Sequence, residues 1–88
     1  MSHLAAYIDL LNSSARIFGG ETYNIRNLDH TAAARLFQRL DCDLSPENLT
    51  CDGELDTATV RRRSAQYRGA IAELKKMGFV QPDSCMEY

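Results

Sequence analysis

The chain has 88 residues, of which 44% are hydrophobic and 25% are charged, and its formal net charge is −2. These proportions are typical of a globular protein rather than a disordered one, and the length fits one domain with a thin core. No apolar run approaches the ~20 residues that cross a bilayer, and the first residues lack a signal-peptide pattern, so we expect a cytoplasmic protein without membrane contact.

The three cysteines, Cys42, Cys51 and Cys85, form no CxxC motif, and their odd number argues against a disulfide framework. Cys42 and Cys51 could in principle bind zinc together with His3 or His30, but the spacing matches no known zinc motif. We therefore expect free thiols, no metal and no cofactor. No catalytic residue stands out, so we expect a protein that is not an enzyme.

The first predicted helix covers residues 3–18. Ser2 is suited to cap its start, and Gly19 or Gly20 is suited to end it. Its apolar residues recur at helical spacing and predict one buried stripe. They are Leu4, Ile8, Leu11, Ala15 and Phe18. Residues 21–28 lose this periodicity, which indicates either an extended connection or a very short strand; since a lone strand would have no partner, we expect a loop.

A second helix is expected to begin after Asp29, which can act as its N-cap, and to end near Asp41. Leu28, just before the cap, can pack on the first turn of this helix. The predicted buried face consists of Ala33, Leu36, Phe37 and Leu40.

The segment 41–56 is acidic and contains turn residues. Ser45 and Pro46 predict a short helical turn, and Asp52 followed by Gly53 predicts a tight turn. A calcium loop beginning at Asp41 would need glycine at its sixth position and glutamate at its twelfth, where the chain has Pro46 and Asp52. These residues therefore indicate a shaped connection, with an acidic binding surface as the alternative.

The third main helix is predicted from Thr57 to Met77, capped by Asp56 and with Leu55 packing against its first turns. Its predicted buried stripe consists of Val60, Ser64, Tyr67, Ile71 and Leu74. Gly78 is suited to a left-handed turn that returns Phe79 to Leu74, and Gly69 suggests a close crossing by another helix.

These elements predict an all-α fold. It is a small bundle of three main helices with a short helical turn in the 41–56 connection. Residues 1–80 are expected to form a single helical domain, and residues 81–88 a flexible tail.

Charge is strongly segregated along the chain. Residues 41–56 carry six carboxylates and no base, whereas residues 57–78 carry six bases and only one acid, Glu73. Such asymmetry concerns association more than folding, so these two regions are the predicted contact regions for a partner. The candidate residues are Asp41, Asp43, Glu47, Asp52, Glu54, Arg61, Arg62, Arg68 and Lys75. An ordinary solvated helix face remains the alternative for the basic residues.

The string "LSPENLTCDGELDTATVRRRSAQYRGAIAEL", residues 44–74, resembles a set of short phage and prophage proteins. In that set a SPENL..DGE string precedes a charged C-terminal helix. The resemblance implies a phage or bacterial origin and carries over no catalytic residue and no cofactor. Small phage proteins often act by binding a host protein, and some inhibit host defence systems such as CRISPR-Cas.

The sequence hypothesis is therefore a non-enzymatic interaction protein that binds a host protein or complex. Its alternative is a small regulator that binds nucleic acid through the basic face of the third helix, a set that also includes Arg63 and Lys76. Association of the chain with itself is a further hypothesis, because a thin core gains from burying more apolar surface.

Overall fold

The computed structural model describes residues 2–50 and 56–80, which form helices and loops without a β-strand. The elements are α1 (His3–Phe18), the 3-10 turn η1 (Ile25–Asn27), α2 (His30–Asp43), α3 (Pro46–Leu49) and α4 (Thr57–Lys76). The prediction of a small all-α bundle with three main helices and a short helical turn between the last two is confirmed.

Three of the helices begin at the caps expected from the sequence. The side-chain oxygens of Ser2, Asp29 and Asp56 accept hydrogen bonds from amides in the first turns of α1, α2 and α4, at 3.0, 2.7 and 2.7 Å. Each of these bonds satisfies an amide that has no partner within its own helix. Ser45 precedes α3 without a side-chain cap, and Pro46 occupies the first helical position.

The end of α4 also follows the prediction. Gly78 has a φ of 98°, a conformation that residues with a Cβ rarely adopt. The amide of Phe79 bonds to the carbonyl of Leu74, and that of Gly78 to the carbonyl of Lys75, each at 3.0 Å. These two hydrogen bonds turn the chain so that Phe79 packs against the core.

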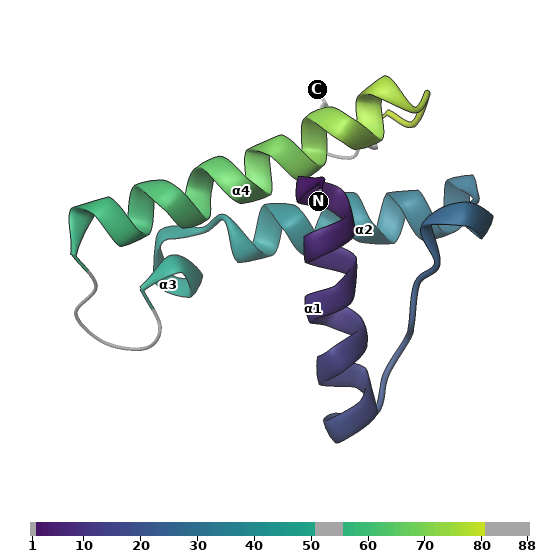
Figure 1. The fold of residues 1–88 in the computed structure, drawn as a ribbon, viewed down its shortest axis with the longest axis horizontal. Coiled ribbons are helices and arrows are strands. Elements are labelled where there is room, and N and C mark those ends of the chain that lie inside the picture. The colour runs from purple at the N-terminus through teal and green to yellow at the C-terminus, as the bar shows by residue number, and fades with distance from the viewer. Residues whose placement is uncertain (1, 51–55, 81–88) are drawn as a thin grey trace, which may run out of the picture.

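Helices α2 and α4 lie alongside each other and run in opposite directions, as Figure 1 shows. Helix α1 crosses both at a steep angle, with its N-terminal half against them and its C-terminal half extending beyond them (Figure 1). Helix α3 lies between the end of α2 and the beginning of α4.

The core forms where α1 crosses the other two long helices. Its buried residues are Leu4, Tyr7 and Ile8 of α1, Ala33, Leu36, Phe37 and Leu40 of α2, and Ala70 and Leu74 of α4. All four residues of the predicted face of α2 are therefore buried. That helix is two residues longer than expected and reaches Asp43.

The predicted stripe of α1 is correct only in its first half. Phe18 was expected in the core, but it is 85% exposed, and Ala15 is only partly buried. The crossing angle explains this difference, because the last turns of α1 extend past α2 and α4 and have no helix to cover them (Figure 1). Tyr7, outside the predicted stripe, takes a place in the core instead.

The stripe of α4 is also shifted from its prediction. Leu74 is fully buried, whereas Val60, Ser64, Tyr67 and Ile71 are only partly buried. Ala70 is fully buried, although the sequence pattern did not single it out. A small residue fits here because the neighbouring Gly69 lies directly against His3 at the start of α1.

The close helix crossing expected at Gly69 is present. A methyl group built on Gly69 would lie 2.7 Å from Cγ of His3, at the start of α1, which is far inside van der Waals contact. Glycine in the middle of a helix is therefore explained by the position of the His3 ring.

Some sequence predictions concern residues outside the described ranges. These are the turn at Asp52 and Gly53, the packing of Leu55, and the tail 81–88. Among the helices of residues 2–50 and 56–80, none is both long enough and apolar enough to cross a membrane.

Candidate interaction surfaces

The basic side chains of α4, apart from Arg63, lie on the outside of the molecule. Arg61, Arg62, Arg68 and Lys75 are all exposed. Three of them, Arg61, Arg68 and Lys75, follow each other at intervals of seven residues and form what we call the basic row. Since an α-helix rises ~1.5 Å per residue, neighbouring members stand ~10 Å apart along α4 and the row is ~21 Å long.

The charges of the basic row are not neutralised within the described part of the chain. The ion pairs found there join Arg35 to Glu21 and Arg39 to Asp43, and both involve α2 rather than α4. Within the row, Arg68 donates a hydrogen bond of 3.2 Å from Nε to the hydroxyl of Ser64, one turn earlier. A neutral acceptor leaves the positive charge of Arg68 in place for a partner.

Arg63 differs from its neighbours in α4. It is partly buried, and its Nη1 donates a hydrogen bond of 3.1 Å to the carbonyl oxygen of Leu49, the last residue of α3. That carbonyl lies at a helix C-terminus, where a positive charge is favourable. Arg63 therefore holds α3 against α4.

The predicted acidic residues fall into three groups. Asp41 and Glu47 are exposed, at the end of α2 and the start of α3. Asp43 is partly buried: it accepts a hydrogen bond from the hydroxyl of Tyr7 at 2.8 Å, and Arg39 lies 3.4 Å away. Asp52 and Glu54 are outside the described residues. The carboxylate of Asp43 therefore connects two helices within the fold, which the sequence did not indicate.

The carboxylate of Asp43 changes the pKa of both side chains that it contacts, Tyr7 and Arg39. Burial raises the pKa of the Tyr7 phenol, and the hydrogen bond to Asp43 raises that pKa further. The nearby Asp43 carboxylate also raises the pKa of the Arg39 guanidinium. At neutral pH the three groups therefore form a neutral phenol bound to an ion pair.

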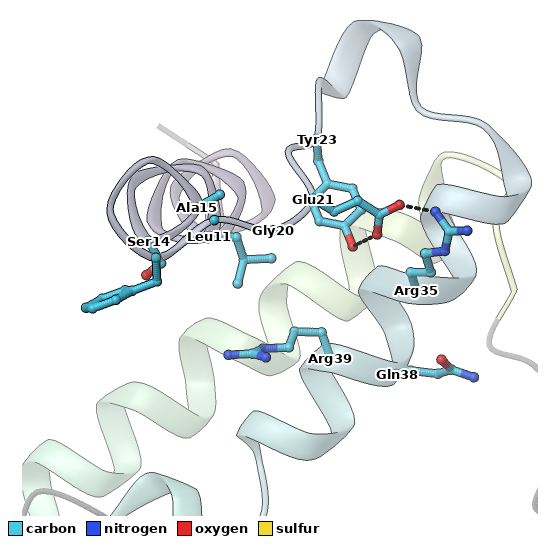
Figure 2. A pocket seen from close by; sticks show the side chains of 11 residues that line it. Leu11, Ser14, Ala15, Gly20, Glu21, Tyr23, Arg35, Gln38 and Arg39 are labelled. Atoms are coloured by element: carbon cyan, nitrogen blue, oxygen red, sulfur yellow. Dashed lines mark hydrogen bonds and ion pairs between the residues drawn. The ribbon is translucent and has the colours of Figure 1, made fainter.

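An open cleft of ~690 Å³ lies between the end of α1, the linker that follows it, and α2. In Figure 2, Glu21 lies between Tyr23 and Arg35 and contacts both. The Tyr23 hydroxyl donates a hydrogen bond of 3.1 Å to Glu21. The pKa of Tyr23 is raised, mainly by partial burial and also by this hydrogen bond. The arginines of the cleft, Arg35 and Arg39, each already have a carboxylate partner.

The linker beside the cleft is fixed to α1 by one side chain. The amide nitrogen of Asn12 donates to the carbonyl of Tyr23, and its oxygen accepts from the backbone amide of Tyr23, both at 2.8 Å. This two-bond contact resembles the pairing between neighbouring strands. Two further polar contacts join different elements in the same way: Tyr7 donates to Asp43, and the backbone amide of Leu4 in α1 donates to the carboxylate of Glu73 in α4.

Possible metal ligands do not gather in the described ranges, where no three His, Cys, Asp or Glu side chains form a group suited to a metal ion. Cys42 is exposed and lies 3.4 Å from the side-chain amide of Asn48. The geometry of Cys51 and Cys85 falls outside these ranges.

One exposed surface was not predicted from the sequence. Leu10 is 53% exposed and Ile17 is 74% exposed, and both lie on α1 away from its buried stripe. The signal was present, because two large apolar residues seven positions apart fall on the same side of a helix. The stripe beginning at Leu4 already accounts for an amphipathic helix, so its periodicity alone does not point to Leu10 and Ile17.

Comparisons with protein-family models, with curated proteins and with solved structures find no match for this chain. Any assignment of function must therefore start from the surfaces described above.

Proposed function

We propose that this protein is a non-enzymatic interaction protein of the phage or prophage type, which binds a host protein or protein complex. The observation that carries this proposal is the exposed basic row of α4, whose charges have no ion-pair partner in the described part of the chain. Arginine is enriched among the residues that contribute most to protein interfaces, which supports a protein as the partner.

The acidic residues support the same proposal. Helix α3 packs beside the beginning of α4, so the exposed Glu47 of α3 and Arg61 of α4 belong to the same end of the molecule (Figure 1). A surface with both signs of charge favours a partner whose charges are arranged in a complementary way. A uniformly anionic polymer would be repelled by the acidic part of this surface.

Binding can be tested by immobilising the protein and recovering partners from a bacterial lysate at low and high salt. We expect one dominant protein that is lost at high salt, because exposed charges are screened by ions. The variant Arg61→Gln/Arg68→Gln should recover it about tenfold less well. The control Arg16→Gln/Arg26→Gln removes two exposed positive charges outside α4 and should bind as the unaltered protein does.

The two double variants separate a specific surface from net charge. Equal loss of the partner in both would mean that the basic row has no special role. Recovery that does not depend on either change would assign binding to another surface. The partner itself would then be identified by mass spectrometry and its complex confirmed with purified components.

The resemblance of residues 44–74 to phage and prophage proteins supports inhibition of a host defence system, such as CRISPR-Cas, as one form of this function. A bacterial strain whose CRISPR-Cas system targets a phage provides the assay. Expression of the protein should raise the number of plaques, and the Arg61→Gln/Arg68→Gln variant should lose most of this effect. Unchanged plaque numbers with an abundant, folded protein would exclude this form of inhibition for the system tested.

The length and spacing of the basic row favour nucleic acid as the alternative partner, because three exposed cations along ~21 Å of helix can each meet a phosphate. Fluorescence anisotropy with a labelled DNA or RNA duplex provides the test. If this function is correct, the affinity should fall steeply with salt. Each arginine or lysine removed from the basic row should reduce the slope of log affinity against log salt concentration by about one unit. Binding that persists in Arg61→Gln/Arg68→Gln would exclude this row as the site.

A further inference from the structure

Helix α1 has a second, exposed face that is partly apolar and lies away from the core. We call Ala6, Leu10, Ser13 and Ile17 the outward face. All four are exposed, and Leu10 and Ile17 are the large apolar members, 53% and 74% exposed. Ile17 belongs to the half of α1 that extends beyond α2 and α4 (Figure 1). An apolar face in this position is open to a second molecule.

The spacing of the outward face is that of a helix pair. Its residues follow each other at intervals of four, three and four, which is the heptad spacing of helices that pack side by side. Large and small residues alternate along it. If two copies of α1 align in opposite directions, Leu10 of each lies over Ser13 of the other, and Ile17 of each lies over Ala6 of the other. The face is therefore complementary to itself in shape.

The surface around Ala6 is already hollowed in a way that fits this arrangement. A depression of ~280 Å³ is lined on one side by Ala6 and Leu10 of α1 and on the other by Gln66 and Tyr67 of α4. In the antiparallel alignment, this depression lies opposite Ile17 of the second copy. Each copy supplies one exposed isoleucine and one depression, as a twofold symmetric contact requires.

The charges of α1 favour the same orientation. Asp9 and Arg16 are exposed, lie seven residues apart, and therefore stand on the same edge of the outward face. In an antiparallel pair, this edge of one helix meets the same edge of the other with its direction reversed. Asp9 of each copy then lies near Arg16 of the second copy, and the contact gains two ion pairs.

We propose that the protein forms an antiparallel homodimer through the outward face of α1, with Ile17 of each copy in the depression of the other. This dimer does not depend on the function proposed above, since that function uses the basic row of α4 and the acidic segment, and no member of the basic row lines the depression. A seam of about two heptads buries less surface than a standard interface, so the dimer is expected to have micromolar affinity.

The mass of the protein can be followed by sedimentation velocity over concentrations from about 1 to about 500 µM. The unaltered chain should change from monomer to dimer within this range. Leu10→Ser should raise the dissociation constant at least about tenfold. The matched control is Val80→Ser, which removes an apolar side chain that is 78% exposed but lies outside the outward face, and its dissociation constant should stay unchanged.

Exchange of charges tests the orientation. Asp9→Arg and Arg16→Asp should each weaken the dimer, because each places like charges in contact. An equimolar mixture of these two variants should form a mixed dimer, since one copy then has only positive and the other only negative charges on this edge. The double variant Asp9→Arg/Arg16→Asp should form a homodimer again. Circular dichroism checks that each variant stays helical.

A monomer at all concentrations would overturn the proposal. A dimer that Leu10→Ser leaves intact would overturn it as well, because another surface would then hold the copies together. A dimer that is sensitive to Leu10→Ser but is not restored by mixing the two charge variants would exclude the antiparallel alignment.

Discussion

The hydroxyl of Tyr7 in α1 donates a hydrogen bond of 2.8 Å to the carboxylate of Asp43, the last residue of α2. The Tyr7 ring is buried and meets the ring of Tyr67 edge-on, with their centres 5.5 Å apart. Arg39, one turn before Asp43, holds the other side of the carboxylate. One contact therefore connects the crossing helix α1 to the end of α2 and involves an acid that the sequence had suggested as a binding residue.

Tyr7→Phe should destabilise the fold by ~1–2 kcal/mol, because the aromatic packing remains while a hydrogen bond to a partly buried carboxylate is lost. The free energy of unfolding measured in urea provides the test. Tyr23→Phe is the matched control, since it removes an exposed hydrogen bond to Glu21 and should change stability by less than ~0.5 kcal/mol. Equal effects of the two changes would mean that the bond from Tyr7 to Asp43 has no special weight.

The raised pKa of Tyr7 predicts a loss of stability in alkali. The unfolded chain should release the Tyr7 proton near the ordinary pKa of 10.0, whereas the folded chain keeps it to higher pH. The contribution of this group is therefore complete below about pH 10 and declines above it. Unfolding of the unaltered protein and of Tyr7→Phe at pH 8 to 11 should show a difference that shrinks above pH 10. A constant difference would contradict the raised pKa.

Gly69 and His3 should be energetically coupled. Alanine in place of a helical glycine normally stabilises by ~1 kcal/mol, but here its methyl group would overlap the ring of His3. We expect Gly69→Ala alone to give little or no gain and Gly69→Ala/His3→Ala to be ~1 kcal/mol more stable than His3→Ala. Urea unfolding of all four proteins completes the double-mutant cycle. Full stabilisation by Gly69→Ala alone would show that the His3 ring moves away freely.

Asn12→Asp tests the contact that holds the linker. Aspartate has the same shape, but above its pKa it only accepts hydrogen bonds, so its second oxygen would face the carbonyl of Tyr23. We expect a loss of ~1–2 kcal/mol at pH 7. Below about pH 4 the protonated acid can donate again, and the loss should become smaller. A loss that does not vary with pH would mean that the amide donor is not needed.

Features within one helix were predictable from the sequence. The caps at Ser2, Asp29 and Asp56 and the turn at Gly78 depend on neighbouring residues, and these elements begin and end as expected. The buried face of α2 was also correct, because its four apolar residues lie where α1 crosses α2 and α4 runs alongside it.

Features that depend on how helices cross could not be predicted from periodicity. The stripe ending at Phe18 is as regular as the part ending at Ile8, yet only the first part is covered, since the crossing angle of α1 is not encoded in its spacing. In the candidate surface, the exposure of the basic row was expected from its position beside the buried stripe. The use of Asp43 within the fold was not, because its partner Tyr7 lies 36 residues away.

The crossing also divides α1 into two parts of unequal stability. Leu4, Tyr7 and Ile8 are held by the core, whereas beyond Leu11 the helix is anchored mainly through Asn12 and the linker. Amide protons in the first part should exchange with solvent only when the whole molecule unfolds. Those near Arg16 should exchange through local fraying of the helix. A second molecule bound along the free half would suppress this fraying. Association there would therefore slow amide hydrogen exchange in a region that the core does not reach.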